Sequence, residues 1–222
     1  LVTGVVGDAQ QKPVVRFDGN HDWFAVKGKV ITSAEYTIIA AVSDTSSLGT
    51  RNLIGNWDGS KGNSTSSVFL GTTDGELAAR RIRFTDDYVM GTSDRELETP
   101  HEHFALTAIS ESNEARVFQN AVLLGAKGAA IADRKYDTDW TIGRQGTSDG
   151  EYWSGEVAEI LVYAVALTEA DRLRVWRYLG EKYELPGLDI KPNPLTAGDA
   201  HRLALIQACR VIFNLNEFVY PD

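Results

Sequence analysis

The sequence predicts an all-β protein, an antiparallel sandwich or barrel, with helices only toward its C-terminal end. About ten short apolar or alternating segments recur at even spacing between turn-forming residues. No helical pattern separates these segments before residue 168, so the alternating strands and helices of a parallel sheet are not expected. The twenty Gly, five Trp and eight Tyr residues favour the same fold class.

The strands are predicted from alternation and from the turn residues between them. They cover residues 13–17, 22–26, 35–42, 51–57, 67–71, 77–84, 103–109, 114–120, 121–124, 140–144 and 155–163. Residues 18–21 (DGNH) have a tight-turn composition, and residues 103–120 are expected to form a hairpin across SESN.

The last predicted strand is apolar on both faces, which indicates an inner strand. Strict alternation places its side chains in two sets: Ala158, Ile160 and Val162 on one face, and Val157, Glu159, Leu161 and Tyr163 on the other.

A helix is predicted directly after this strand. Thr168 and Asp171 have the spacing of a capping box, and the helix ends before LPG at 185–187. Its apolar stripe must dock on a surface, and the sandwich is the nearest one. The stripe consists of Leu173, Trp176, Leu179 and Tyr183.

From Pro186 onward the composition becomes that of an extended linker. A second helix is expected from about 197 to 213, because Thr196 and Asp199 repeat the capping-box spacing. The predicted domains are therefore 1–186, the β domain, and 187–222, a linker with a C-terminal helical tail.

The net charge of −9 disfavours nucleic-acid binding, which needs a basic surface. The densest basic cluster is Arg80, Arg81 and Arg83, which we expect to be solvated strand positions. A single cysteine, Cys209, allows neither an intrachain disulfide nor a Cys-based metal site. No apolar run is long enough to span a bilayer, so no membrane insertion is expected. Because Leu1 is not a start methionine and no signal peptide follows, the chain is expected to be processed or cut from a longer one.

Three segments resemble laminin-G-like, concanavalin A-like (pentraxin-like) jelly-roll modules. They are VVRFDGNHDWFAV (14–26), HFALTAISESNEARVFQNAVLLG (103–125) and the stretch from WTIGRQGTSDGEYW to the helix end at RYLGEKY (140–183). In the second segment, Asn120-Ala121 stands where an Asn-Gly turn is usual. The resemblance implies two antiparallel sheets packed face to face and sealed by a closing helix.

The resemblance also implies function. Such modules bind carbohydrate or protein, often with calcium, and are usually extracellular or periplasmic. We therefore expect a secreted, periplasmic or cell-surface protein. The tail ALIQACRVIFNLNEFVYPD (204–222) resembles the end of large exported bacterial proteins that pair cytochrome-like domains with a laminin-G-like module. This second resemblance implies a bacterial relative whose C-terminal helix docks on another domain or subunit.

The turn after the first long strand is a candidate calcium site. Asp18, Asn20 and Asp22 place oxygen ligands at alternate positions, although Trp23 stands where an EF-hand requires Gly. The resemblance implies that this loop can share a cation with carboxylates from elsewhere, and Glu159 is the candidate. The alternatives are that Asp and Asn cap their own turn, and that Glu159 pairs with Arg or backbone amides.

Two loops, 56–64 and 144–153, combine aromatic, acidic and amide groups. Aromatic faces stack on the C–H faces of sugars, while Asp, Asn and Arg hydrogen-bond the hydroxyls. The alternative is that Trp57 and Trp153 pack at the edge of the core. This alternative is preferred for Trp153. The candidate ligand-binding residues are Trp57, Asp58, Arg144, Asp149 and Tyr152.

A catalytic reading rests on Asp94, Glu96 and Glu98, since glycosidases of this fold set two carboxylates on one strand face. Their Gly, Ser and Pro neighbours instead indicate an exposed loop or edge strand. We expect a non-catalytic recognition module for carbohydrate or a cell-surface partner. One alternative is a structural domain of a larger exported assembly, and a second is a glycoside hydrolase or lyase.

Overall fold

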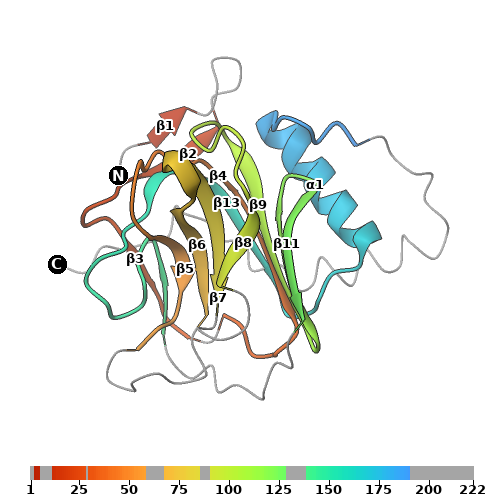
Figure 1. Cartoon of the computed structure of the whole chain (residues 1–222), viewed down its shortest axis with the longest axis horizontal. Coiled ribbons are helices and arrows are strands. Elements are labelled where there is room, and N and C mark those ends of the chain that lie inside the picture. Colours follow the sequence, from red (N-terminus) through yellow and green to blue (C-terminus); the bar gives the residue numbers. More distant parts are fainter. Residues whose placement is uncertain are drawn as a thin grey trace.

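In the computed structural model the described residues are 3–5, 12–28, 30–58, 68–85, 91–128 and 139–190. They form two antiparallel sheets packed face to face, with one α-helix on the outer face of the larger sheet (Figure 1). The predicted two-sheet sandwich is thus confirmed. The seven-stranded sheet has the order β1 (Thr3–Val5), β2 (Pro13–Asp18), β13 (Ser154–Tyr163), β4 (Tyr36–Val42), β9 (Phe104–Glu111), β10 (Glu114–Gln119) and β11 (Val122–Gly128).

The six-stranded sheet forms the second layer. Its order is β3 (Phe24–Val26), β12 (Trp140–Ile142), β5 (Arg51–Gly55), β6 (Phe69–Asp74), β7 (Arg80–Thr85) and β8 (Gly91–Glu96). The turn at 18–21 joins β2 to β3, so it crosses from one sheet to the other rather than closing a hairpin. The hairpin of β9 and β10 across residues 112–113 is as predicted.

Every residue of β4 is buried, because this strand lies in the middle layer of a three-layer arrangement. Ile38, Ala40 and Val42 face the six-stranded sheet, whereas Ile39 and Ala41 face the helix. A strand that contributes to two separate cores needs apolar side chains on both of its faces.

Strand β13 is likewise buried on both faces, but the alternation of its side chains between the two faces is interrupted. The register shifts between Val157 and Glu159, as in a β-bulge. Val157 therefore joins Ile160 in the core between the sheets, and Ala158 faces the helix instead. The predicted inner strand is confirmed, while the predicted faces of Val157 and Ala158 are wrong because of the bulge.

Helix α1 (Glu169–Tyr183) begins at the predicted cap, where Thr168 Oγ1 accepts from the Asp171 backbone N–H at 3.3 Å. Its buried side lies on the seven-stranded sheet (Figure 1). Trp176 Nε1 donates to Thr107 Oγ1 on β9 at 2.9 Å, which satisfies the indole in a buried site. Leu173 is only partly buried but packs against the same core, and Val175 adds a further buried side chain to the stripe.

Two strands lacked a clear sequence signal. β1 is only three residues long, and β8 consists of polar residues (GTSDRE). β8 lies at the end of its sheet, as expected for an edge strand around Asp94. Residues 76–78 form a short 3-10 helix, η2 (Glu76–Ala78), instead of starting a strand, so β7 begins only at Arg80.

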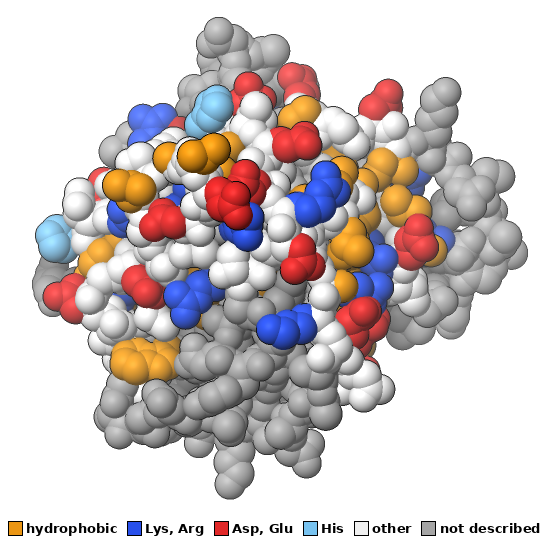
Figure 2. Space-filling view, viewed as in Figure 1, with side chains coloured by type: hydrophobic (Ala, Val, Ile, Leu, Met, Phe, Trp, Pro, Cys, Tyr) orange, Lys and Arg blue, Asp and Glu red, His pale blue; other side chains and the backbone are white. Residues whose placement is uncertain are grey.

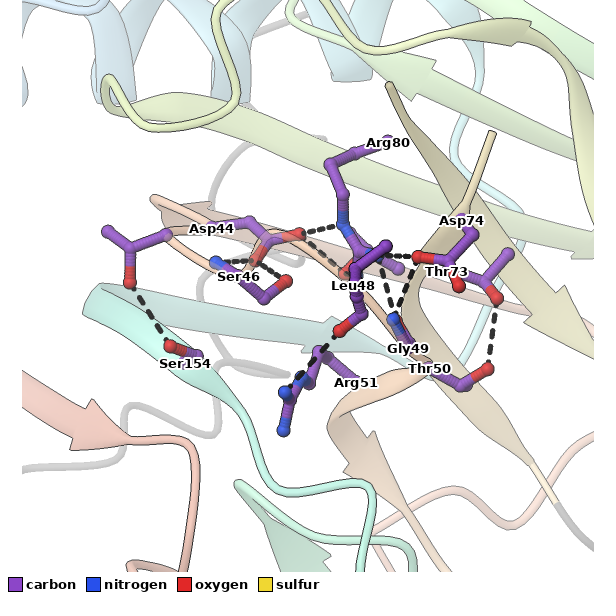
Figure 3. Close-up of polar contacts among 12 residues, drawn as sticks. Asp44, Ser46, Leu48, Gly49, Thr50, Arg51, Thr73, Asp74, Arg80 and Ser154 are labelled. Atoms are coloured by element: carbon purple, nitrogen blue, oxygen red, sulfur yellow. Dashed lines mark hydrogen bonds and ion pairs between the residues drawn. The ribbon is translucent and has the colours of Figure 1, made fainter. Parts of the chain in front are cut away.

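The expectation that Arg80 is solvated is wrong, since its side chain is 2% exposed. Arg80 Nε pairs with Asp44 Oδ2 at 3.0 Å, and Nη1 contacts Asp74 Oδ1 at 2.9 Å and the Gly49 carbonyl at 2.8 Å (Figure 3). Thr72 Oγ1 also donates to Asp44 Oδ2, at 2.6 Å. A buried charge needs such partners. Through these contacts, Arg80 joins the β4–β5 connection to β6 and β7.

The described part of the predicted linker packs back on the domain. Leu188 is 2% exposed and lies against Gly180 of α1, where an added Cβ would be 2.8 Å from the Leu188 carbonyl oxygen. The predicted helix at 197–213 and the tail at 204–222 lie outside the described residues. Among the helices that are described, none has the length and apolar character needed to cross a membrane.

Candidate ligand-binding site

The turn between β2 and β3 uses its polar side chains on its own backbone. Asp18 Oδ1 accepts from the N–H groups of Asn20 at 2.8 Å and His21 at 3.2 Å, and Asp22 Oδ2 accepts from the Asp18 N–H at 3.2 Å. The pKa of Asp18 is lowered, chiefly because the Asn20 N–H stabilises its charged form. These contacts correspond to the alternative in which Asp and Asn cap their own turn.

Glu159 is not part of that turn. Its carboxylate accepts from the hydroxyls of Tyr178 at 3.1 Å and Tyr183 at 3.0 Å, and from Lys182 Nζ at 2.8 Å, all on α1. Asp18 pairs with Ser154, and Glu159 lies five residues farther along β13, about 16 Å away at roughly 3.3 Å per residue.

The four calcium candidates therefore do not share one cage. The partners of Glu159 are the phenol hydroxyls and the ammonium group of side chains on α1. The sequence had suggested a cation, Arg or backbone amides instead. Within the described part of the chain, no group of three or more His, Cys, Asp or Glu side chains is placed to hold a metal ion.

A pocket of about 420 Å³ lies where β3, β12 and the loop after β5 meet. Trp23 and Trp57 line it with their side chains partly exposed, and Asp58, Asp139 and Arg144 bring charge to it. The volume falls within the size range of small-molecule pockets. Its remaining lining residues are Ala25, Trp140, Thr141, Gly146 and Thr147.

Arg144 is held in place by the aromatic wall of the pocket. Its guanidinium carbon lies 3.6 Å from the centroid of the Trp23 ring, and its Nε donates to the Gly146 carbonyl at 2.9 Å. Stacking and a backbone contact together fix a side chain that would otherwise be mobile. Trp23, which is 38% exposed, is fixed by the same contact.

The loop that carries Arg144 is fastened to the loop that carries Trp57. Thr141 Oγ1 donates to the Arg144 carbonyl at 2.6 Å and accepts from the Gly146 N–H at 2.8 Å. The Thr147 N–H donates to the Trp57 carbonyl at 2.9 Å. Gly146 has φ +51°, and a Cβ there would lie 1.8 Å from the Trp57 carbonyl oxygen, so the close approach requires glycine.

Asp149 and Tyr152 stand beside this pocket rather than in its lining. Tyr152 Oη donates to Asp149 Oδ1 at 2.7 Å. The pKa of Tyr152 is raised, first by that hydrogen bond, while the neighbouring Arg144 acts in the opposite sense. The ring of His21 meets Tyr152 edge-on at 5.7 Å, which connects the turn at 18–22 to the same region.

Of the predicted ligand residues, the structure brings Trp57, Asp58 and Arg144 into one pocket, with Asp149 and Tyr152 adjacent. Trp153 is fully buried in the core, as the preferred alternative had it. Trp23 and Asp139 were missed. A signal for Trp23 was available, since alternation in DWFAV turns Phe24 and Val26 inward and leaves an aromatic side chain facing outward.

The carboxylates of the catalytic reading lie elsewhere. Asp94 and Glu98 are exposed, and Glu96 Oε1 accepts from the Glu76 N–H at 2.8 Å and lies 3.6 Å from Arg81 Nη2. They belong to the edge strand β8 and the residues after it, and none of them lines the pocket.

Acidic and basic side chains alternate over the face shown in Figure 2. Among the described residues of that face, no continuous basic surface is visible, in agreement with the net charge of −9.

The laminin G family described as the Concanavalin A-like lectin/glucanases superfamily matches residues 18–171. The chain belongs to this superfamily. No curated protein matches the sequence.

Three solved structures illustrate the shared fold. A heptameric SAP-like pentraxin from Limulus polyphemus is 13% identical, with a TM-score of 0.54 over 70% of this chain and 77% of that one. The CBM40 module of the Ruminococcus gnavus IT-sialidase, bound to α2,3 sialyllactose, is 14% identical, with a TM-score of 0.51 over 73% and 96%. At these identities the likeness concerns the fold alone.

The third structure, a leech intramolecular trans-sialidase, is 19% identical, with a TM-score of 0.55. The match covers 84% of this chain but only 29% of the enzyme. The match therefore spans less than a third of that enzyme's length.

Proposed function

We propose that this superfamily member is a non-catalytic carbohydrate-binding module that holds a sugar in the pocket between Trp23 and Trp57. The observation that carries the proposal is the combination of two partly exposed indoles with Asp58, Asp139 and Arg144 in one pocket. Indole faces pack on sugar C–H groups, and carboxylates and a guanidinium hydrogen-bond hydroxyls. The CBM40 module that shares its fold is solved with a bound glycan, which supports the same use of the fold.

Isothermal titration against a glycan panel tests this function. We expect saturable binding to at least one glycan and a loss of about tenfold or more in affinity for Trp23→Ala, as for the loss of a buried anchor. Val122→Ala is the matched control, because Val122 is an exposed apolar residue on β11, in the other sheet. Equal affinities for Trp23→Ala and the wild type would contradict the proposed site. Cleavage of the bound glycan would contradict the non-catalytic reading.

Calcium is tested in the same titration. Because Asp18, Asn20 and Asp22 serve their own turn and Glu159 serves α1, we expect binding to be unchanged when calcium is replaced by a chelator. A loss of binding in the chelator that calcium restores would show that a cation completes the site.

A further inference from the structure

Beside the pocket, two segments form a continuous surface, which we call the rim. The turn between β2 and β3 contributes His21 and Trp23, and the loop after β12 contributes Arg144, Asp149 and Tyr152. Trp23 and Arg144 also line the pocket, whereas His21, Asp149 and Tyr152 do not. The rim therefore begins at the pocket wall and continues beyond it.

Side-chain contacts link each residue of the rim to the next. The Arg144 guanidinium stacks on Trp23. The hydrogen bond to Asp149 raises the pKa of Tyr152 and Arg144 opposes this shift, so Tyr152 lies next to the guanidinium. The rings of Tyr152 and His21 meet edge-on, with their centroids 5.7 Å apart. The rim is thus unbroken from Trp23 to His21.

Arg51 fixes the two segments of the rim relative to each other. Its Nη1 donates to the Gly19 carbonyl of the turn at 3.0 Å and to the Tyr152 carbonyl of the loop at 3.3 Å. Gly19 has φ +79°, and a Cβ there would lie 2.9 Å from the Ser154 Cβ, so the turn rests directly on β13. A surface that is already in place loses little conformational entropy when a ligand binds to it.

The end of the rim that lies outside the pocket presents polar atoms that the protein leaves unused. His21 and Asp149 are exposed. Within the described ranges, neither the ring nitrogens of His21 nor Asp149 Oδ2 has a hydrogen-bond partner. A neutral imidazole offers one donor and one acceptor, and a carboxylate oxygen accepts. Both side chains can therefore pair with the hydroxyls of a sugar.

We infer that the ligand is an oligosaccharide that occupies the pocket and continues over the rim, with one sugar unit against Trp23 and a later unit at His21 and Asp149. This inference rests on the proposed function and deepens it, because it names the ligand class. A single sugar in the pocket leaves the polar atoms of the rim to water. A longer chain reaches them as an intramolecular event on a surface that needs no rearrangement, so its affinity rises.

Isothermal titration with sugar chains of increasing length tests the inference. The probes are malto-, cello-, xylo- and chito-oligosaccharides of one to six units, together with the length series of any other glycan that binds. We expect affinity to rise about tenfold or more between the shortest member that binds and the hexamer. Equal affinities for short and long members would overturn the role of the rim while leaving the carbohydrate-binding function standing. Failure of every glycan would overturn both.

Substitutions assign the gain in affinity to the rim. His21→Ala should weaken hexamer binding about three- to tenfold, as for a lost hydrogen bond, without a matching loss for the shortest member. Trp57→Ala should weaken both, because Trp57 lines the pocket. His101→Ala is the matched control, since His101 is an exposed histidine between β8 and β9 that belongs to neither the pocket lining nor the rim. Equal losses for short and long members, or a hexamer affinity no lower than that of His101→Ala, would contradict the role of the rim.

Discussion

At the scale of single residues, the pocket depends on one glycine. Gly146 allows the loop that carries Arg144 to contact the loop that carries Trp57. Gly150 lies in the same loop with φ +127°, but an added Cβ there would meet nothing within 4 Å. A comparison of the two glycines therefore separates the effect of a steric clash from the effect of a positive φ alone.

Gly146→Ala is expected to force the Trp57 loop away, because its Cβ would overlap the Trp57 carbonyl. Glycan affinity should fall at least about tenfold, and stability by roughly 1–3 kcal/mol, as for a strained backbone position. Gly150→Ala should cost only its backbone strain, about 1 kcal/mol, with affinity retained. Titration and urea denaturation of both variants check this, and equal affinities would argue against the role of the close contact.

At the residue scale, the sequence singled out Trp57, Asp58 and Arg144 because aromatic and charged residues next to Gly-rich turns are typical of binding loops, and the structure places all three in one pocket. It missed Asp139, which lines the same pocket as Asp58 because β12 pairs with β5. It also misplaced Glu159 and Arg80, since the partners that bury them come from distant segments. Burial of a charged residue is a property of the assembled fold.

At the scale of elements, the connection from β4 to β5 is held by a buried ion pair. Arg80 on β7 reaches Asp44 and the Gly49 carbonyl within this connection, and Asp74 on β6 accepts from the Gly49 N–H at 2.8 Å (Figure 3). The next residue of the strand, Arg81, is a quarter exposed and pairs loosely with Glu76 and Glu96. The two arginines therefore form a natural comparison.

Arg80→Met should destabilise the domain by about 3–5 kcal/mol, because it leaves the Asp44 carboxylate buried without its cation. Arg81→Met should cost less than about 1 kcal/mol, as for an exposed pair. Urea denaturation measures both variants. Similar losses for the two would show that the buried pair is not what holds the β4–β5 connection.

A second element-scale prediction concerns pH. His103, before β9, lies with Nε2 3.1 Å from Glu156 Oε2 on β13, and Glu156 also pairs with Arg16 on β2. The pKa of His103 is lowered because burial disfavours its charged form, although Glu156 partly opposes this shift. In the folded state His103 is therefore harder to protonate than in the unfolded chain.

The unfolded chain takes up the His103 proton first as pH falls, so stability should decline below about pH 6.5, the ordinary pKa of histidine, until pH passes the lowered folded value. His103→Asn should remove this part of the pH dependence. Urea denaturation between pH 5 and 8, in steps of about half a unit, tests it. A slope unchanged by the substitution would assign the effect to other groups.

At the scale of the whole molecule, the fold class was predictable from the sequence, whereas among the strand pairings only the β9–β10 hairpin was predicted. Short alternating segments fix the class, and the doubly apolar β4 and β13 indicate a layer with cores on both sides. The composition of residues 18–21 predicted a tight turn, which is a local property, whereas the sheet that each flanking strand joins is decided by long-range packing. The bulge in β13 likewise has no local signature.

The central claim is that a sugar binds against Trp23 and Trp57, and the five tryptophans allow a direct test. The measurement is a titration of ¹⁵N-labelled protein with a glycan that binds, following the indole N–H resonances assigned by single Trp substitutions. We expect the Trp23 and Trp57 signals to shift in proportion to saturation, while the signal of Trp176, which α1 buries against the seven-stranded sheet, stays in place. Saturable binding with the Trp23 and Trp57 signals unmoved would contradict the account.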